Sequence, residues 1–314
     1  MRTLNPENNG QKPEALRRGA SGRHKENVME YAPPIGVDAS CPHRPDFPFA
    51  PPEGTDRLCE NLVNTRFDQL SEDNIRIFKD RLLDITGCIF GGAVVPEDQF
   101  LETMLSRWGG IPEAPLFARK GRLPMPSAVM LNSITARAND FGNMFFHVLG
   151  DRIASHCGET LFPMGLTLAD TQKTTGQEFI ANQVAAEDLT ARVLYTLPMR
   201  WPTDMLMVSS AAAALAARYY GLDTKQTKVA LTYAATNATD PANSYYDYSQ
   251  EFKYHNGASA QMGIYACELA KGGWDGWADP FFGHWGLVTK QIKDGAPVPA
   301  LYEKAFTGLG EVWY

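Results

Sequence analysis

The chain has 314 residues, of which 44% are apolar and 21% charged, and it contains 27 Gly and 21 Pro. This composition excludes a collagen, a disordered protein and a small disulfide-stabilised domain, and the length is sufficient to bury a large core. The formal net charge is −7, yet residues 1–27 carry six Lys or Arg against three Glu, which leaves about −10 for the remainder. An acidic folded part has no basic face for phosphates, so we expect no nucleic-acid partner.

The cysteine pattern and the hydropathy indicate a cytoplasmic location. Five scattered cysteines form no C-x-x-C pair, which is typical of buried thiols in a reducing compartment. The N-terminus lacks the apolar core of a signal peptide, and the longest apolar stretch, Met205–Ala217, is interrupted by two serines. We therefore expect no contact with a membrane.

The first 55 residues are predicted to form a flexible, proline-rich N-terminal arm. Nine prolines between positions 6 and 52, mixed with Asn, Gly and charged residues, disfavour regular structure. Three aromatic residues, Tyr31, Phe47 and Phe49, leave open the alternative that the arm wraps around a partner.

From Asp56 onward the sequence shows the period of α-helices. Ser71 is a good N-cap for a helix that begins with two acidic residues, and Gly91 and Gly92 end it. Its apolar residues recur at intervals of three and four: Ile75, Phe78, Leu82, Ile85 and Ile89. Further helices are expected over Ser127–Arg137, Gly158–Ala169, Gly176–Tyr195, Asp204–Tyr220, Lys225–Ala235 and Asn256–Lys271.

The segment Asp204–Tyr220, preceded by Thr203 as its N-cap, is expected to lie at the centre of the fold. Its residues 211–217 are almost all alanine, which allows neighbouring helices to approach closely, and Gly221 ends it. The sequence does not show several alternating strand patterns joined by hairpin turns. We therefore predict an all-α fold, a multi-helix bundle that forms one domain over residues 56–314.

The common cofactor and nucleophile motifs are missing from the sequence. It contains no G-x-x-x-x-G-K-[ST], no G-x-G-x-x-G after a strand, no G-x-S-x-G and no H-E-x-x-H. Any chemistry is therefore expected to come from side chains alone, without a cofactor or a metal ion.

Three polar segments stand out between the apolar helices. They are Asn139–Asn143, Ser155–Thr160 and Phe252–Gly257. The last two are expected immediately before helices, where free backbone N–H groups and the helix dipole favour a bound carboxylate. With His156, Lys253 or His255 added, such a helix terminus could bind a carboxylate and move protons.

Each of these residues also has a purely structural interpretation. Asp140 suits a turn or a helix cap, His156 a loop histidine with satisfied hydrogen bonds, and Lys253 a solvated cation. A metal site is a further alternative, although the candidate ligands match no known ligand spacing: Asp140, His147, His156 and Cys157.

A series of short segments lies in an order that is typical of one protein family. The segments are Asn64–Leu70, Leu83–Cys88, Gly91–Ala93, Leu131-Asn132, Asn139–Phe141, His156–Glu159, Phe162-Pro163, Ala212–Leu222 and His255–Ala260. Over residues 57–314 this order resembles the MmgE/PrpD family, a cofactor-independent group that includes 2-methylcitrate dehydratase, cis-aconitate decarboxylase and iminodisuccinate epimerase.

The resemblance implies a helical main domain joined to a smaller α+β lid, with the active site in the cleft between them. Members of the family add or remove a proton beside a substrate carboxylate, and so dehydrate, decarboxylate or epimerise small di- and tricarboxylates. By position, Asp140 matches the acid of the family's Asp-Phe-Asp-Asp segment, His156 the histidine before Pro-Gly, and Lys253 approximately the active-site lysine.

The chain departs from the family pattern at several of these positions. Gly142 and Asn143 stand where the family has two further acids, and Trp201 falls where several members have a histidine. Lys253 precedes the following glycine by four residues rather than five. The segment 309–314 resembles the end of the helical part, so we expect the lid, which closes the cleft against water, to be absent from this chain.

Two functions from different classes are consistent with this pattern. The first is one subunit of a cofactor-independent carbon–oxygen or carbon–carbon lyase, or of an isomerase, which acts on a small carboxylic acid under a lid from a second polypeptide. Its predicted catalytic residues are Asp140, His156, Lys253 and His255, and its predicted substrate-binding residues are Asn139, Asn143, Trp201 and Asn256. The second is a non-catalytic scaffold or partner subunit that retains the fold without activity. We expect a homo- or hetero-oligomer in either case.

Overall fold

A computed structural model describes residues 53–197, 203–238, 249–283, 286–288, 303 and 305–309. The predicted N-terminal arm up to residue 52, the predicted substrate-binding residue Trp201 and the segment 310–314 lie outside these residues.

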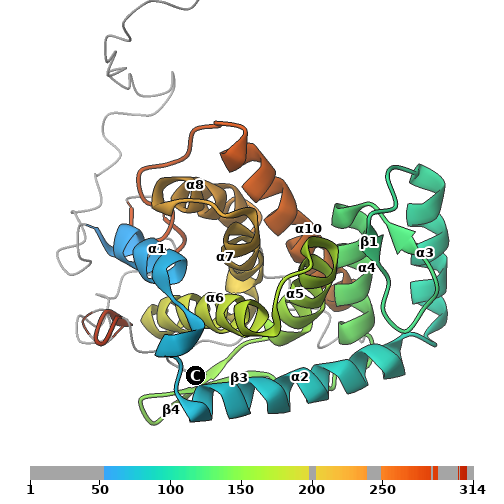
Figure 1. The fold of residues 1–314 in the computed structure, drawn as a ribbon, viewed down its shortest axis with the longest axis horizontal. Coiled ribbons are helices and arrows are strands. Elements are labelled where there is room, and N and C mark those ends of the chain that lie inside the picture. Colours follow the sequence, from blue (N-terminus) through green and yellow to red (C-terminus); the bar gives the residue numbers. More distant parts are fainter. Residues whose placement is uncertain are drawn as a thin grey trace, which may run out of the picture. The chain divides into compact units, whose positions relative to one another are not determined.

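The described part of the chain is an all-α bundle, as predicted (Figure 1). Its α-helices are α1 (Gly54–Asn64), α2 (Glu72–Gly92), α3 (Pro96–Trp108), α4 (Met125–Arg137), α5 (Gly158–Gln172), α6 (Gly176–Thr196), α7 (Val208–Tyr220), α8 (Thr224–Ala235) and α10 (Glu251–Lys271). Two short 3-10 helices, η1 (Phe67–Gln69) and η2 (Thr203–Met207), precede α2 and α7. Two small antiparallel sheets pair β1 (Ala114–Pro115) with β2 (Arg122–Leu123), and β3 (Phe145–Val148) with β4 (Asp151–Ala154).

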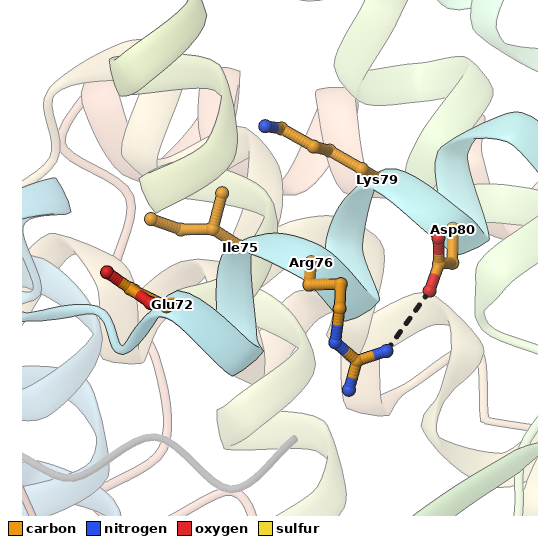
Figure 2. Close-up of a pocket in the computed structure, with 5 residues that line it drawn as sticks. All are labelled: Glu72, Ile75, Arg76, Lys79 and Asp80. Carbon is orange, nitrogen blue, oxygen red and sulfur yellow. Dashed lines mark hydrogen bonds and ion pairs between the residues drawn. The ribbon is translucent and has the colours of Figure 1, made fainter.

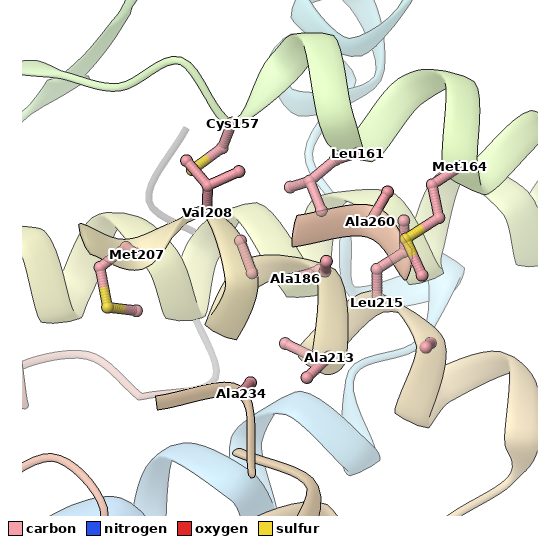
Figure 3. Close-up of a cluster of buried hydrophobic side chains, with 14 of the residues drawn as sticks. Cys157, Leu161, Met164, Ala186, Met207, Val208, Ala213, Leu215, Ala234 and Ala260 are labelled. Atoms are coloured by element: carbon pink, nitrogen blue, oxygen red, sulfur yellow. The ribbon is translucent and has the colours of Figure 1, made fainter. Parts of the chain in front are cut away.

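Helix α7 lies at the centre of the bundle, as its alanine-rich sequence predicts (Figure 1). Every residue from Val208 to Ala217 is buried, and the helix packs against α5, α6, α8 and α10. Figure 3 shows Val208, Ala213 and Leu215 among buried side chains of the neighbouring helices. Small residues permit this packing, because a Cβ added at Gly263 of α10 would lie 2.7 Å from the backbone of Ala212.

Helix α2 begins and ends where the sequence predicts. The Ser71 hydroxyl accepts a hydrogen bond from the Asn74 N–H at 3.1 Å, and the Asn74 side chain accepts one from the Ser71 N–H at 3.0 Å. This reciprocal cap satisfies two backbone donors at the helix start. At the other end, a Cβ added at Gly92 would overlap the carbonyl oxygen of Thr135, so α2 approaches α4 this closely only with glycine.

Helix α10 starts earlier than the sequence predicts. It begins at Glu251 rather than Asn256, so Lys253 and His255 are helical residues and do not lie in a loop before the helix. Gln250, the N-cap, makes no side-chain capping hydrogen bond. No Ser, Thr, Asp or Asn cap therefore marks this start in the sequence.

Further features differ from the prediction, which included neither α1 nor α3. Residues 203–207 form a 3-10 turn, so α7 begins at Val208 rather than Asp204. The β3–β4 hairpin turns at Leu149 and Gly150, which both have positive φ, of 51° and 87°. Leucine is not a residue that signals such a turn, and the hairpin is therefore not evident from the sequence.

The described ranges contain no helix that is both long and apolar enough to cross a membrane. Of the cysteines that were expected to be buried thiols, Cys59, Cys157 and Cys267 are buried, Cys88 is only half-buried, and Cys41 lies outside the described residues. Burial raises the pKa of Cys267 far above its usual value, so this thiol stays protonated at neutral pH.

Candidate active site

A buried ionic cluster, formed by Arg137, Glu159 and His156, lies where α4 ends and α5 begins. Arg137, the last residue of α4, donates from Nη1 to Oε1 of Glu159 at 3.2 Å, and both side chains are fully buried. The same carboxylate oxygen lies 3.4 Å from Nδ1 of His156. A carboxylate thus lies between a guanidinium and an imidazole in a site of low dielectric, where their interactions are strong.

The start of α5 places two of these groups. Cys157 is the N-cap of α5, so His156 lies directly before the helix, as predicted. Glu159 is in the first helical turn, where the helix dipole favours a carboxylate. The chain therefore supplies its own anion at this helix terminus.

One nitrogen of the buried Arg137 guanidinium is paired, and the other two have no hydrogen-bond partner among the described residues. Nη1 is paired with Glu159 and with the carboxylate of Asp140. Nε and Nη2 are buried and find no hydrogen-bond partner in the described part of the chain. These two N–H groups lie side by side and match the two oxygens of a carboxylate. The ring of Phe252 lies beside the guanidinium, with its centroid 5.0 Å from Cζ.

Asn256 connects α10 to the cluster. Its fully buried side chain donates from Nδ2 to the carbonyl oxygen of His156 at 2.9 Å and to the hydroxyl of Thr160 at 3.0 Å. Its Oδ1 is buried and accepts no hydrogen bond from any residue that the structure describes. Asn256 therefore fixes the segment that carries His156 and leaves one acceptor available.

Replacing Asn256 by leucine is expected to lower the free energy of unfolding by about 1–3 kcal/mol, because two buried groups lose their donor. Urea denaturation followed by circular dichroism measures this. Asn139→Leu is the control: Asn139 is exposed, and the change is expected to stay within about 0.5 kcal/mol. A loss for Asn256→Leu no larger than the control's would show that these hydrogen bonds do not hold α10 in place.

Asp140 joins the cluster from the solvent side. Its backbone has a φ of 55°, a conformation that aspartate tolerates, and its carboxylate pairs with Arg137 while remaining 48% exposed. A Cβ added at Gly142 would overlap the carboxylate of Glu159, so this loop packs directly on the cluster. The predicted polar loop thus covers the cluster and places one acid at its rim.

The other loop residues have different surroundings. Asn143 accepts hydrogen bonds from Nε and Nη2 of Arg81, at 3.1 and 2.7 Å, and donates to Asp84 at 3.3 Å. Arg81 in turn pairs with the buried Glu187 at 3.1 Å. Asn143 therefore anchors the loop to α2, and its role in substrate binding, like that of the exposed Asn139, stays a prediction.

Lys253 and His255 lie on α10 beside Phe252. His255 is 8% exposed, and the ammonium of Lys253 lies 6.0 Å from the centroid of the Phe252 ring. Lys253 is also close to the acids at the start of α3. Burial raises the pKa of Asp98, and the positive charge of Lys253 is among the interactions that oppose this shift. Lys253 therefore interacts electrostatically with Asp98 of α3 and lies near the ring that contacts Arg137.

Sequence reasoning missed Arg137 and Glu159 as site residues. Arg137 is the only charged residue in a helix of apolar and small polar residues, and its side chain is fully buried. Glu159 follows His156 by three residues, one turn of a helix further on. A lone arginine on a buried helix and an acid one turn after a histidine are the signals that could have identified them.

The alternative metal site does not assemble. Within the described ranges, no group of three or more His, Cys, Asp or Glu side chains is arranged to hold a metal ion. The four residues considered from the sequence, Asp140, His147, His156 and Cys157, thus do not converge.

A shallow hollow of about 330 Å³ lies over the first half of α2 (Figure 2). It is lined by Glu72, Ile75, Arg76, Lys79 and Asp80. Arg76 pairs with Asp80 at 3.3 Å, and both side chains are more than 60% exposed. This hollow contains solvated ion pairs and none of the predicted site residues, so we do not consider it the active site.

The described part of the chain is thus an all-α bundle that buries a carboxylate, an imidazole and a guanidinium together. A comparison with protein-family models matches residues 56–298 to the MmgE/PrpD N-terminal domain. The chain therefore belongs to the MmgE/PrpD family, a family of dehydratase-type proteins, as the sequence resemblance indicates. No curated protein matches the chain.

Proposed function

We propose that this chain is the helical domain of a cofactor-independent lyase or isomerase that moves a proton at the carbon beside a substrate carboxylate. The observation that carries the proposal is that Nε and Nη2 of the buried Arg137 have no hydrogen-bond partner among the described residues, next to the His156–Glu159 pair. A charge buried without its full set of hydrogen bonds is costly, so an unfilled guanidinium edge favours an anionic ligand. Family membership supports the same chemistry.

In this proposal Arg137 binds the two oxygens of the substrate carboxylate through Nε and Nη2. The imidazole of His156 accepts the proton from the adjacent carbon, and the electron pair of that C–H bond moves into the carboxylate, where Arg137 stabilises the added negative charge. Glu159 stabilises the imidazolium. Epimerisation follows when a second acid, such as Lys253, gives a proton to the opposite face of that carbon while His156 keeps the proton that it removed. Loss of the hydroxyl group of the neighbouring carbon as water, with the proton supplied by the ammonium of Lys253, gives dehydration, and Asp140 orients Arg137.

Lys253 and a lid domain complete the proposed active site. Lys253 lies on α10 next to Phe252, whose ring also contacts Arg137, so a second proton donor is available near the cluster. A lid-like domain, which we expect from a second polypeptide, would cover Phe141, whose side chain is 80% exposed beside Asp140. Such a cover would exclude water from the reacting carbon.

Hydrogen exchange tests the proposed function. The full chain, alone and mixed with a separately expressed lid-like protein, is incubated in D₂O with small di- and tricarboxylates, and loss of the C–H signal is followed by NMR. His156→Asn and Glu159→Gln are each expected to slow the exchange by about 10²–10⁴-fold.

Lys79→Met, an exposed change on α2, is the matched control and is expected to leave the exchange unchanged. If the folded wild-type chain catalyses no exchange under either condition, the scaffold alternative is favoured and the proposed function is wrong.

A further inference from the structure

The loop between α4 and β3 is fixed to α2 through both ends of the Asn143 amide. Oδ1 accepts hydrogen bonds from Nε and Nη2 of Arg81, at 3.1 and 2.7 Å, and Nδ2 donates to Oδ2 of Asp84 at 3.3 Å. Arg81 and Asp84 are three residues apart on α2, so they contact the loop from one side of that helix. Asparagine suits this position because its short side chain carries an acceptor for the arginine and a donor for the aspartate.

The guanidinium of Arg81 is itself held from the core side. Nη1 and Nη2 contact the two carboxylate oxygens of the buried Glu187, at 3.2 and 3.1 Å. Its Cζ lies 5.2 Å from the centroid of the Phe146 ring and 5.8 Å from that of the Phe162 ring. Helix α2 also packs against α4, α5 and α6 (Figure 1). Asn143 is therefore bound to a part of the bundle that is packed on several sides.

The loop held in this way lies directly on the first turn of α5. A Cβ added at Gly142 would overlap Oε1 of Glu159, the oxygen at the centre of the ionic cluster. A Cβ added at Gly158, the first residue of α5, would lie 2.8 Å from Oδ1 of Asn143. Two glycines thus permit a contact that leaves the Glu159 carboxylate little room to move.

We infer that Asn143 is a positioning residue of the ionic cluster. Through its contacts with α2 it keeps Gly142 on the carboxylate of Glu159, and so keeps Oε1 beside the imidazole of His156. This inference rests on the proposed function, in which Glu159 stabilises the imidazolium of His156. Asn143 acts here without contacting the substrate, so its loss is expected to lower kcat more than it changes KM.

A swap of the amide and the carboxylate tests the inference. Asn143→Asp keeps an acceptor for Arg81 but places a carboxylate opposite Asp84, so the loop is expected to shift and kcat for the C–H exchange to fall about 10–100-fold. Asn143→Asp combined with Asp84→Asn again sets a donor opposite an acceptor and is expected to recover most of the lost rate. The assay uses low ionic strength, because Asp84 is exposed and salt screens exposed charges.

Asn143→Asp combined with Asp80→Asn is the matched control. Asp80 lies one helical turn before Asp84 and pairs with Arg76, so removing its charge is expected to leave the exchange as slow as in Asn143→Asp alone. All these variants are expected to keep the far-UV circular dichroism spectrum of the wild type. An exchange rate that Asn143→Asp leaves unchanged would overturn the inference.

A measurement without substrate separates this inference from the proposed function. The ring ¹H–¹⁵N NMR signals of His156 are assigned by their loss in His156→Asn. They are expected to shift in Asn143→Asp and to return when Asp84→Asn is added, because the ring contacts Glu159 through Nδ1. If they do so in a chain that catalyses no exchange, the proposed function is wrong and the positioning role stands. Ring signals that do not shift, or that Asp84→Asn does not restore, would show that Asn143 does not position the cluster.

Discussion

Replacing Arg137 by methionine is expected to lower the free energy of unfolding by about 3–5 kcal/mol, because it leaves a buried carboxylate without its cation. Glu159 is fully buried. Among the described residues, the basic side chains in contact with its carboxylate are Arg137, at 3.2 Å, and His156, at 3.4 Å. Taking that carboxylate out of water is costly unless it is paired. Urea denaturation at neutral pH, followed by circular dichroism, measures the change.

Two further variants make this prediction specific. Arg137→Met combined with Glu159→Gln is expected to recover most of the lost stability, because neither partner is then left as an unpaired charge. Arg76→Met is the surface control: Arg76 pairs with Asp73 and Asp80 but is 62% exposed, so the expected loss is under about 1 kcal/mol. A loss for Arg137→Met no larger than that for Arg76→Met would refute the account of the cluster.

Replacing Gly257 by alanine is expected to destabilise the fold by about 1–3 kcal/mol through overpacking. A Cβ at this position would lie 2.5 Å from Cγ1 of Ile134 and 2.8 Å from the carbonyl oxygen of Met130. The second contact is with backbone, so the crowding is relieved only by moving α10 away from α4. Because Asn256 is the preceding residue, the same movement would loosen its hydrogen bonds to the segment of His156.

Gly176→Ala is the matched control for this helix contact. Gly176 is the first residue of α6, and a Cβ added there would meet nothing within 4 Å. Alanine is a better helix former than glycine, so stability is expected to stay the same or rise by less than about 1 kcal/mol. Equal stabilities of the two variants in a thermal melt would contradict the proposed role of the α4–α10 contact.

The extent to which the site follows from the sequence differs from residue to residue. His156 lies directly before α5 and Asp140 lies in the loop after α4, as predicted, because both positions follow from nearby helix boundaries. Lys253 and His255 were expected before a helix and lie within it, because α10 starts at Glu251 without a capping side chain. A helix end without a local cap is set by packing, which the sequence does not display.

The sequence by itself determined the helical class of the fold and the ends of its well-capped helices. Ser71 caps α2 by reciprocal hydrogen bonds, and Gly221 ends α7 with a φ of 63°. These signals are readable because cap and helix are neighbours in the chain. The alanine run likewise placed α7 at the centre, since only small side chains let several helices approach it.

Only the tertiary structure decided which polar residues form the site. Arg137 and Glu159 are 22 residues apart, and Asn256 is 100 residues from the His156 carbonyl that it binds. No local period links such positions, and a charged residue looks the same in sequence whether it is solvated or buried. Helix packing brought these groups together and removed water from them. Their charges and hydrogen bonds are stronger for that reason, because a buried site has a lower dielectric constant than water.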